Sequence, residues 1–125
     1  MRVARFMSAR EFGLFMKGKT IRPIHDCSGS SMNTMESASV CFFPWSDDRK
    51  AECMVQTRFA REIIGERLET TPGGGYLCIF EVNSKRLQGG EGLYGDTCST
   101  EYYMPCYNKR LVKLVRAEYR RQCSF

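Results

Sequence analysis

Several residue patterns with well-known chemistry are missing from this chain of 125 residues. It has a single histidine, His25, and none of its seven cysteines belongs to a C-x-x-C pair. The close ligand pairs typical of a structural zinc site are therefore missing. No apolar run approaches the roughly 18 residues that cross a bilayer, and the N-terminus lacks the apolar segment of a secretory signal. We expect reduced thiols in a cytoplasmic protein, with no metal site and no membrane contact.

Phosphate-binding loops are also absent. The glycine-rich stretch at residues 71–75 contains no lysine and no G-K-[ST] pattern, so it is not a P-loop. What the chain does contain is typical of one globular domain spanning residues 1–125: 42% hydrophobic and 26% charged residues. A chain of this length buries one core.

Hydrophobic patterning and β-branched or aromatic residues predict strands. We expect them at residues 2–7, 37–43, 76–82, 98–104 and 110–116, the last with a short helix as the alternative. Pro105 is expected to end the fourth of these strands or to mark it as an edge. The strand at 76–82 is the most apolar, and we expect it to be central.

Two helices are predicted in the first half of the chain. Ser8 and Glu11 form a capping box, in which Ser8 caps the helix and Glu11 reaches back to it; Gly18 supplies the stop. A second helix is expected after the Ser46-Asp47-Asp48 cap, up to about Gly65. Residues 19–37 and 83–96 are predicted loops. The fold class is therefore α+β, a mostly antiparallel sheet of about five or six strands with two helices packed on it.

The net charge of +5 is concentrated near the C-terminus. Residues 109–121 contain six basic residues and one acidic residue, Glu118. Such a segment contacts nucleic acid or an acidic protein surface, or is simply a solvated face. The candidate partner-binding residues are Lys109, Arg110, Lys113 and Arg116.

Three short motifs together resemble the ADP-ribosyltransferase fold, in particular its arginine–serine–glutamate branch. They are V-A-R-F-M-S at 3–8, S-A-S-V-C-F-F at 37–43 and S-T-E-Y at 99–102. We expect Arg5 at the end of the first strand, just before a helix N-terminus. The layout resembles that family over nearly the whole chain.

The resemblance implies NAD as co-substrate and a protein or nucleic-acid target. It implies Glu101 as the catalytic glutamate, because a carboxylate stabilises the oxocarbenium-like ribose formed when nicotinamide leaves. It assigns Arg5 to NAD binding and Ser37 or Ser39 to holding the ribose. Phe42 and Tyr102 are candidates to stack on nicotinamide, as is Tyr103.

Each of these residues also has a plainer interpretation. Arg5 is placed to pair with Glu11 or Glu81, and a glutamate on a strand is often solvated. Ser99 stands where arginine-modifying members carry Glu or Gln, so arginine is not the expected acceptor. The alternative function is a non-enzymatic phage-type inhibitor, such as an anti-CRISPR protein, that binds a host complex partly through the basic C-terminal face.

Overall fold

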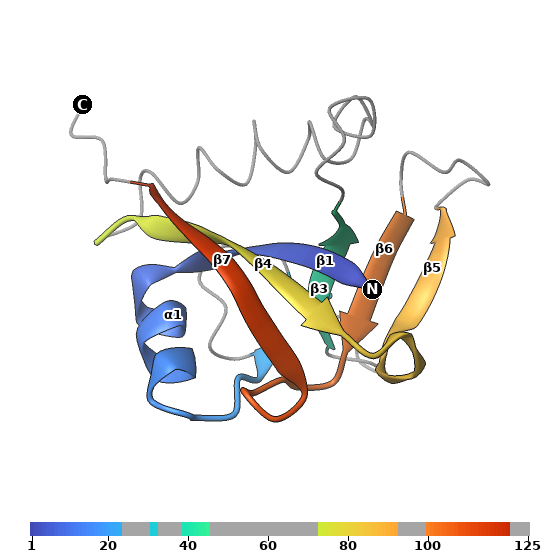
Figure 1. Cartoon of the computed structure of the whole chain (residues 1–125), viewed down its shortest axis with the longest axis horizontal. Coiled ribbons are helices and arrows are strands. Elements are labelled where there is room, and N and C mark those ends of the chain that lie inside the picture. The colour runs from blue at the N-terminus through green and yellow to red at the C-terminus, as the bar shows by residue number, and fades with distance from the viewer. Residues whose placement is uncertain (24–30, 33–38, 46–72, 93–99, 121–125) are drawn as a thin grey trace.

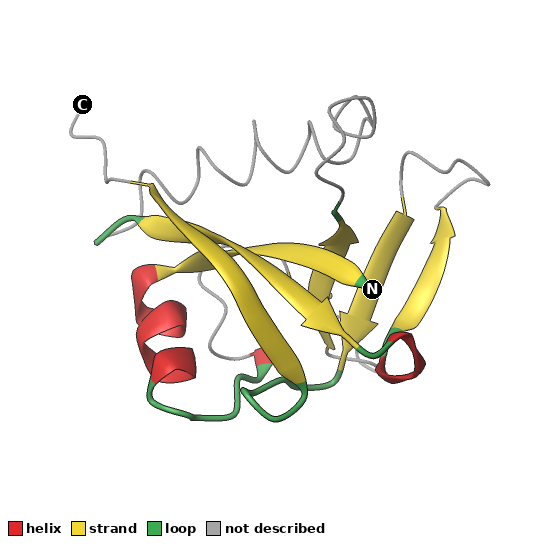
Figure 2. Cartoon of the chain, viewed as in Figure 1, coloured by secondary structure: helices red, strands yellow, loops and turns green. Residues whose placement is uncertain are grey.

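The computed structural model describes residues 1–23, 31–32, 39–45, 73–92 and 100–120, and these form one antiparallel sheet with a helix against it (Figures 1 and 2). The strands are β1 (Arg2–Ser8), β2 (Ser31–Met32), β3 (Ser39–Pro44), β4 (Gly75–Val82), β5 (Gln88–Gly92), β6 (Thr100–Met104) and β7 (Val112–Arg120). The helix α1 spans Ala9–Met16, and a short 3-10 helix, η4, spans Ser84–Arg86.

The sheet has the strand order β5-β6-β3-β1-β4-β7 within the described residues, and β2 pairs with β3 beside this path. Every pairing is antiparallel. Strand β4 pairs with β1 from Gly75 to Glu81 and with β7 on its other side, so it is an interior strand. It lies second from the β7 edge, however, and the middle of the order is taken by β3 and β1. The α+β class and the antiparallel sheet are therefore confirmed.

Helix α1 begins and ends as the local sequence predicts. The Ser8 hydroxyl accepts a hydrogen bond from the Glu11 backbone N–H at 3.1 Å, which caps the first turn. Gly18 follows the helix with a φ of +81°, a left-handed conformation that favours glycine. The Glu11 side chain, however, does not complete the capping box, because other residues bind its carboxylate.

Two apolar clusters lie on opposite faces of the sheet. In β1, Val3 and Met7 belong to the larger cluster, whereas Ala4 and Phe6 belong to the smaller one. This alternation is the two-residue period of a strand. The larger cluster includes Phe15 of α1, so α1 covers that face. The smaller cluster includes Trp45, which is 8% exposed.

Some expected boundaries were wrong. The predicted loop at 83–96 contains η4 and the glycine-rich edge strand β5, and β2 lies inside the predicted irregular stretch 19–37. Strand β7 runs on to Arg120 and is not a helix. Strand β6 ends at Met104, which confirms the expected end of that strand at Pro105. The predicted second helix lies outside the described residues.

Candidate functional site

The three strands that carry the predicted site residues are consecutive neighbours in the sheet. Strand β3 pairs with β6 through Cys41↔Tyr103 and Phe42↔Tyr102, and with β1 through Ala4↔Phe43. The strands of Arg5, Ser39 and Glu101 therefore lie side by side although the residues are far apart in sequence. In Figure 1, β3 lies between β1 and β6.

Arg5 lies within β1, not at its end, because the strand continues to Ser8. Its side chain is buried, with 1% of its surface exposed. The guanidinium forms a bidentate pair with Glu11: Nε donates to Oε2 at 3.0 Å and Nη2 donates to Oε1 at 2.6 Å. Nη1 donates to the Cys41 carbonyl at 3.0 Å, which ties β1 to β3.

Tyr107 completes this buried network. Its hydroxyl donates to Glu11 Oε2 at 2.8 Å and lies 4.0 Å from the Met7 sulfur. Burial, with the Glu11 carboxylate beside it, raises the pKa of the Tyr107 hydroxyl well above its usual range. The hydroxyl therefore stays a proton donor to Glu11. A buried carboxylate held by a guanidinium fork and a hydroxyl has its charge and lone pairs satisfied, so the network is structural in character.

Arg5 and Ser39 face opposite sides of the sheet. Arg5 shares its row in β1 with Val3 and Met7, which belong to the larger cluster. In β3, Val40 and Phe42 belong to that same cluster, so Ser39 alternates to the other face. Ser39 is itself buried, with 3% of its surface exposed. The structure brings the two strands together but not the two side chains.

The predicted nicotinamide-stacking residues differ in access. Phe42 is 1% exposed and packs edge-on against Phe80 and Tyr107, so it belongs to the core, contrary to the predicted stacking role. Tyr102 is half-buried against the same cluster, and Tyr103 is half-buried as well.

Two predicted site residues, Glu101 and Ser37, fall partly or wholly outside the described part of the chain, as does the single histidine. Glu101 lies in β6, but its side chain is not among those described. Ser37 and His25 lie outside the described residues. The predicted pairing of a ribose-holding serine with a catalytic glutamate therefore rests on Ser39 in β3 and on the backbone position of Glu101 in β6.

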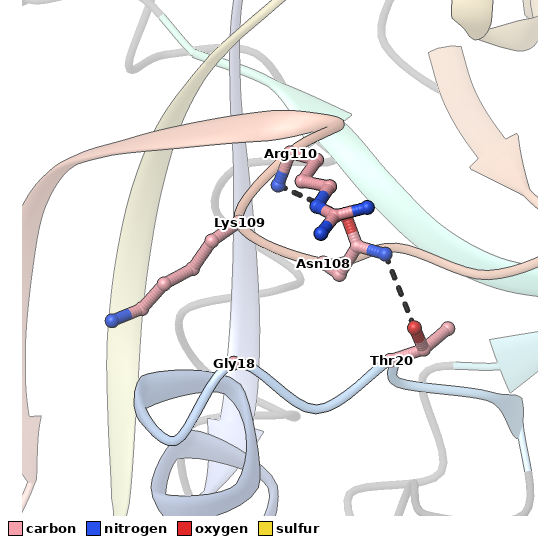
Figure 3. Close-up of a pocket in the computed structure, with 5 residues that line it drawn as sticks. All are labelled: Gly18, Thr20, Asn108, Lys109 and Arg110. Carbon is pink, nitrogen blue, oxygen red and sulfur yellow. Dashed lines mark hydrogen bonds between the residues drawn. The ribbon is translucent and has the colours of Figure 1, made fainter.

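Some residues of the predicted basic segment contact other side chains of the protein, and others are exposed. The Arg116 guanidinium lies 5.7 Å from the centre of the Trp45 ring, and its Nε is 3.3 Å from Glu118. Lys109, Arg110 and Lys113 are exposed. Lys109 and Arg110 line a pocket of about 360 Å³ together with Gly18, Thr20 and Asn108 (Figure 3).

Sequence reasoning missed three residues that organise these sites: Tyr107, Thr20 and Asn108. The plainer interpretation of Arg5 as a partner of Glu11 is confirmed, although the pair is buried and was expected at the surface. One local signal was available, since asparagine is a typical turn residue whose side chain bonds the backbone two residues on. The Asn108 Oδ1 accepts hydrogen bonds from the backbone N–H groups of Arg110 and Leu111 at 2.9 and 3.2 Å.

Within the described residues, no cluster of His, Cys, Asp and Glu is placed to hold a metal ion. Cys78 and Cys106 carry free thiols, and burial raises the pKa of the Cys78 thiol far above its usual value. The same part of the chain contains no helix with the length and apolar character of a membrane span.

Comparisons with protein-family models, curated proteins and solved structures give no match for this chain.

Proposed function

We propose that this chain is an NAD-dependent ADP-ribosyltransferase-like protein that modifies a macromolecular target, with Glu101 as its catalytic residue. One observation carries the proposal. Strands β1, β3 and β6, which bear the three motifs of the resemblance, are consecutive neighbours in the sheet. This is the arrangement that a site assembled from three distant motifs requires.

The assignment of Arg5 to NAD binding does not fit its surroundings. The guanidinium has five N–H donors, and Glu11 and Cys41 take three of them inside the core. We therefore assign Arg5 a positioning role. It fixes the Cys41 carbonyl, between Ser39 and Phe42 in β3, and so holds the strand that carries the ribose-binding serine.

The remaining residues fit the chemistry of the resemblance. NAD, when bound, supplies the ADP-ribosyl group and nicotinamide as the leaving group. The Glu101 carboxylate stabilises positive charge on the ribose and accepts a hydrogen bond from its 2′-hydroxyl. We assign Ser39 to the ribose alone, because the register of β3 and β6 places Glu101 opposite Phe43, four residues along β3 from Ser39. Tyr103 is the better-placed stacking residue, because it alternates to the Ser39 face, whereas Phe42 and Tyr102 pack on the larger cluster on the other face.

A labelled-NAD transfer assay tests this proposal. Wild-type protein, Glu101→Gln and Glu118→Gln are incubated with labelled NAD and a bacterial lysate, and the label joined to protein and nucleic acid is measured. Glu118 is a matched control, because it lies in β7 at the far edge of the sheet and pairs only with Arg116 among the described ion pairs. We expect the wild type and Glu118→Gln to transfer label, and we expect the amount transferred by Glu101→Gln to be lower by about 10²-fold or more.

A second candidate function keeps the same fold without catalysis, as an inhibitor that binds a host complex. The exposed cations Lys109, Arg110 and Lys113 favour it, because they present positive charge on one surface. It predicts a stoichiometric complex whose affinity is the same with and without NAD. Binding that survives Glu101→Gln and is lost on reversing the charge of Lys109 and Arg110 supports this function over the enzymatic one.

A further inference from the structure

Two pockets adjoin where the end of α1 meets the turn before β7. The first is the polar pocket of about 360 Å³ lined by Gly18, Thr20, Asn108, Lys109 and Arg110. The second, of about 260 Å³, is mainly apolar and is lined by Phe15, Met16, Lys109, Val112, Lys113 and Leu114. Lys109 lines both, so the two pockets form one continuous surface, the α1/β7 surface.

Contacts between distant segments hold this surface in place. Ile21 and Tyr107 exchange backbone hydrogen bonds of 2.7 and 3.0 Å. The Asn108 side-chain amide donates to the Thr20 hydroxyl at 3.1 Å, as Figure 3 shows. The polar pocket is therefore preformed from two parts of the chain.

The rim of the surface is strongly basic. Its exposed cations come from both segments: Lys17, Lys19, Lys109, Arg110 and Lys113. The described carboxylates form their ion pairs elsewhere: Glu11 with Arg5, Glu81 with Arg2 and the N-terminus, and Glu118 with Arg116. Positive charge on this surface is therefore not neutralised by the described part of the protein.

The groups in the polar pocket match a phosphate. Arg110 offers a planar fork of donors, the preferred partner of phosphate oxygens. The Lys109 ammonium donates to the Met16 carbonyl at 2.8 Å, which positions it and leaves two of its three N–H donors available. The Asn108 amide and the Thr20 hydroxyl add neutral hydrogen-bonding groups beside these cations.

The adjoining pocket provides apolar surface of the kind that a sugar and base cover. Met16 is 45% exposed, and Leu114 is half-buried beside it. An acidic peptide would leave this apolar surface uncovered, whereas a nucleotide has both an anionic phosphate and a base whose faces are apolar. We propose that the α1/β7 surface binds single-stranded nucleic acid, with a backbone phosphate in the polar pocket and the neighbouring nucleoside against Met16 and Leu114.

This inference does not rest on NAD chemistry, because it concerns a surface without Ser39 or Glu101, and its test contains no NAD. The probe is a fluorescein-labelled oligouridylate of about 12 nucleotides, within the range that single-strand sites cover. Fluorescence anisotropy gives its affinity for the full chain between about 50 and 200 mM salt.

A charge-reversal pair tests the phosphate site. Lys109→Glu with Arg110→Glu removes the two cations that hold the one phosphate, so the slope of log affinity against log salt should become shallower by about 0.7, the contribution of one phosphate contact. The affinity for the oligouridylate at low salt should fall by about tenfold or more. Lys85→Glu with Arg86→Glu in η4 is the matched control, since this exposed basic pair lies elsewhere and changes the net charge equally. It should alter affinity by less than about twofold.

Two single substitutions of exposed apolar residues, one at the surface and one away from it, test the nucleoside site. Met16→Ser should weaken oligouridylate binding and leave inorganic polyphosphate binding unchanged, because polyphosphate has no base. Val115→Ser is its control, since Val115 is comparably exposed, at 42% against 45% for Met16. Circular dichroism confirms the fold of each variant.

Three outcomes would overturn the proposal. The first is no salt-dependent binding of the oligonucleotide by the wild type at low salt. The second is an equal loss of affinity in the Lys109/Arg110 and Lys85/Arg86 variants, which means that net charge alone drives binding. The third is displacement by poly-glutamate as effective as by unlabelled oligouridylate, which means that the surface takes acidic protein segments.

Discussion

Replacing Arg5 separates a structural role from a cofactor-binding role. In Arg5→Met, the carboxylate of Glu11 stays buried and loses both arms of its guanidinium partner. Removing one partner of a buried ion pair costs about 3–5 kcal/mol. With an unfolding entropy of about 2.1 cal/mol/K per residue, a 125-residue chain loses about 4 °C of Tm per kcal/mol. We therefore expect Tm to fall by about 11–19 °C.

Thermal and urea unfolding followed by circular dichroism measure this loss without any ligand. Arg2→Met is the matched control, because Arg2 lies in the same strand but pairs with Glu81 at the surface, at 3.3 Å. An exposed pair of this kind contributes about 0–1 kcal/mol. The double variant Arg5→Met with Glu11→Leu replaces the whole pair by apolar side chains and should recover much of the lost stability.

The reasoning is refuted if Arg5→Met unfolds at the wild-type temperature and denaturant concentration but no longer binds NAD. That result would make Arg5 a cofactor ligand. A double variant no more stable than Arg5→Met would likewise show that the Glu11 charge is not what destabilises the single variant.

Three smaller perturbations test other parts of the structure. Tyr107→Phe removes a hydrogen bond to the Glu11 carboxylate and should lower the free energy of unfolding in urea by about 1.5–3 kcal/mol, against no change if that bond does not form. Ser8→Ala removes the cap of α1 and should cost about 1 kcal/mol, with Ser8→Asp retaining most of the stability. The Cys78 thiol stays protonated in the folded state, whereas the unfolded thiol ionises above about pH 8.5, so its contribution to stability is full below that pH and is lost as the pH rises. Cys78→Ala should therefore make the decline in unfolding free energy between about pH 8 and 10 shallower, and an unchanged decline would contradict the shift in its pKa.

Local signals predicted the elements whose cause is local. The Ser8 cap, the Gly18 stop and the strand at 76–82 follow from neighbouring residues, and the structure confirms all three. Strand β5 was predicted as a loop because glycines have low strand propensity, and only its pairing with β6 makes it a strand. Its register with β6 is irregular between Gly89 and Gly92, as expected for a strand with few side chains to fix it.

Long-range contacts could not be predicted from the sequence alone. Tyr107 lies 96 residues from Glu11 along the chain, so no local pattern indicates that the Tyr107 hydroxyl donates a hydrogen bond to the Glu11 carboxylate. An aromatic pair at 42–43 predicts a buried strand, but the side of the sheet that Phe42 faces depends on how β3 pairs with β1. Likewise, Thr20 and Asn108 join one pocket only because the chain segments around Ile21 and Tyr107 form a bridge.

The rate of nicotinamide release from NAD tests the proposed function most directly, because it requires no knowledge of the acceptor. Purified wild-type protein and Glu101→Gln are compared at equal concentration, with Glu118→Gln as the control and Tm measured for all three. The account predicts release by the wild type and the control, and a rate lower by at least about 10²-fold in Glu101→Gln at unchanged Tm. Equal rates in Glu101→Gln and the wild type, or no release by any of them, would contradict it.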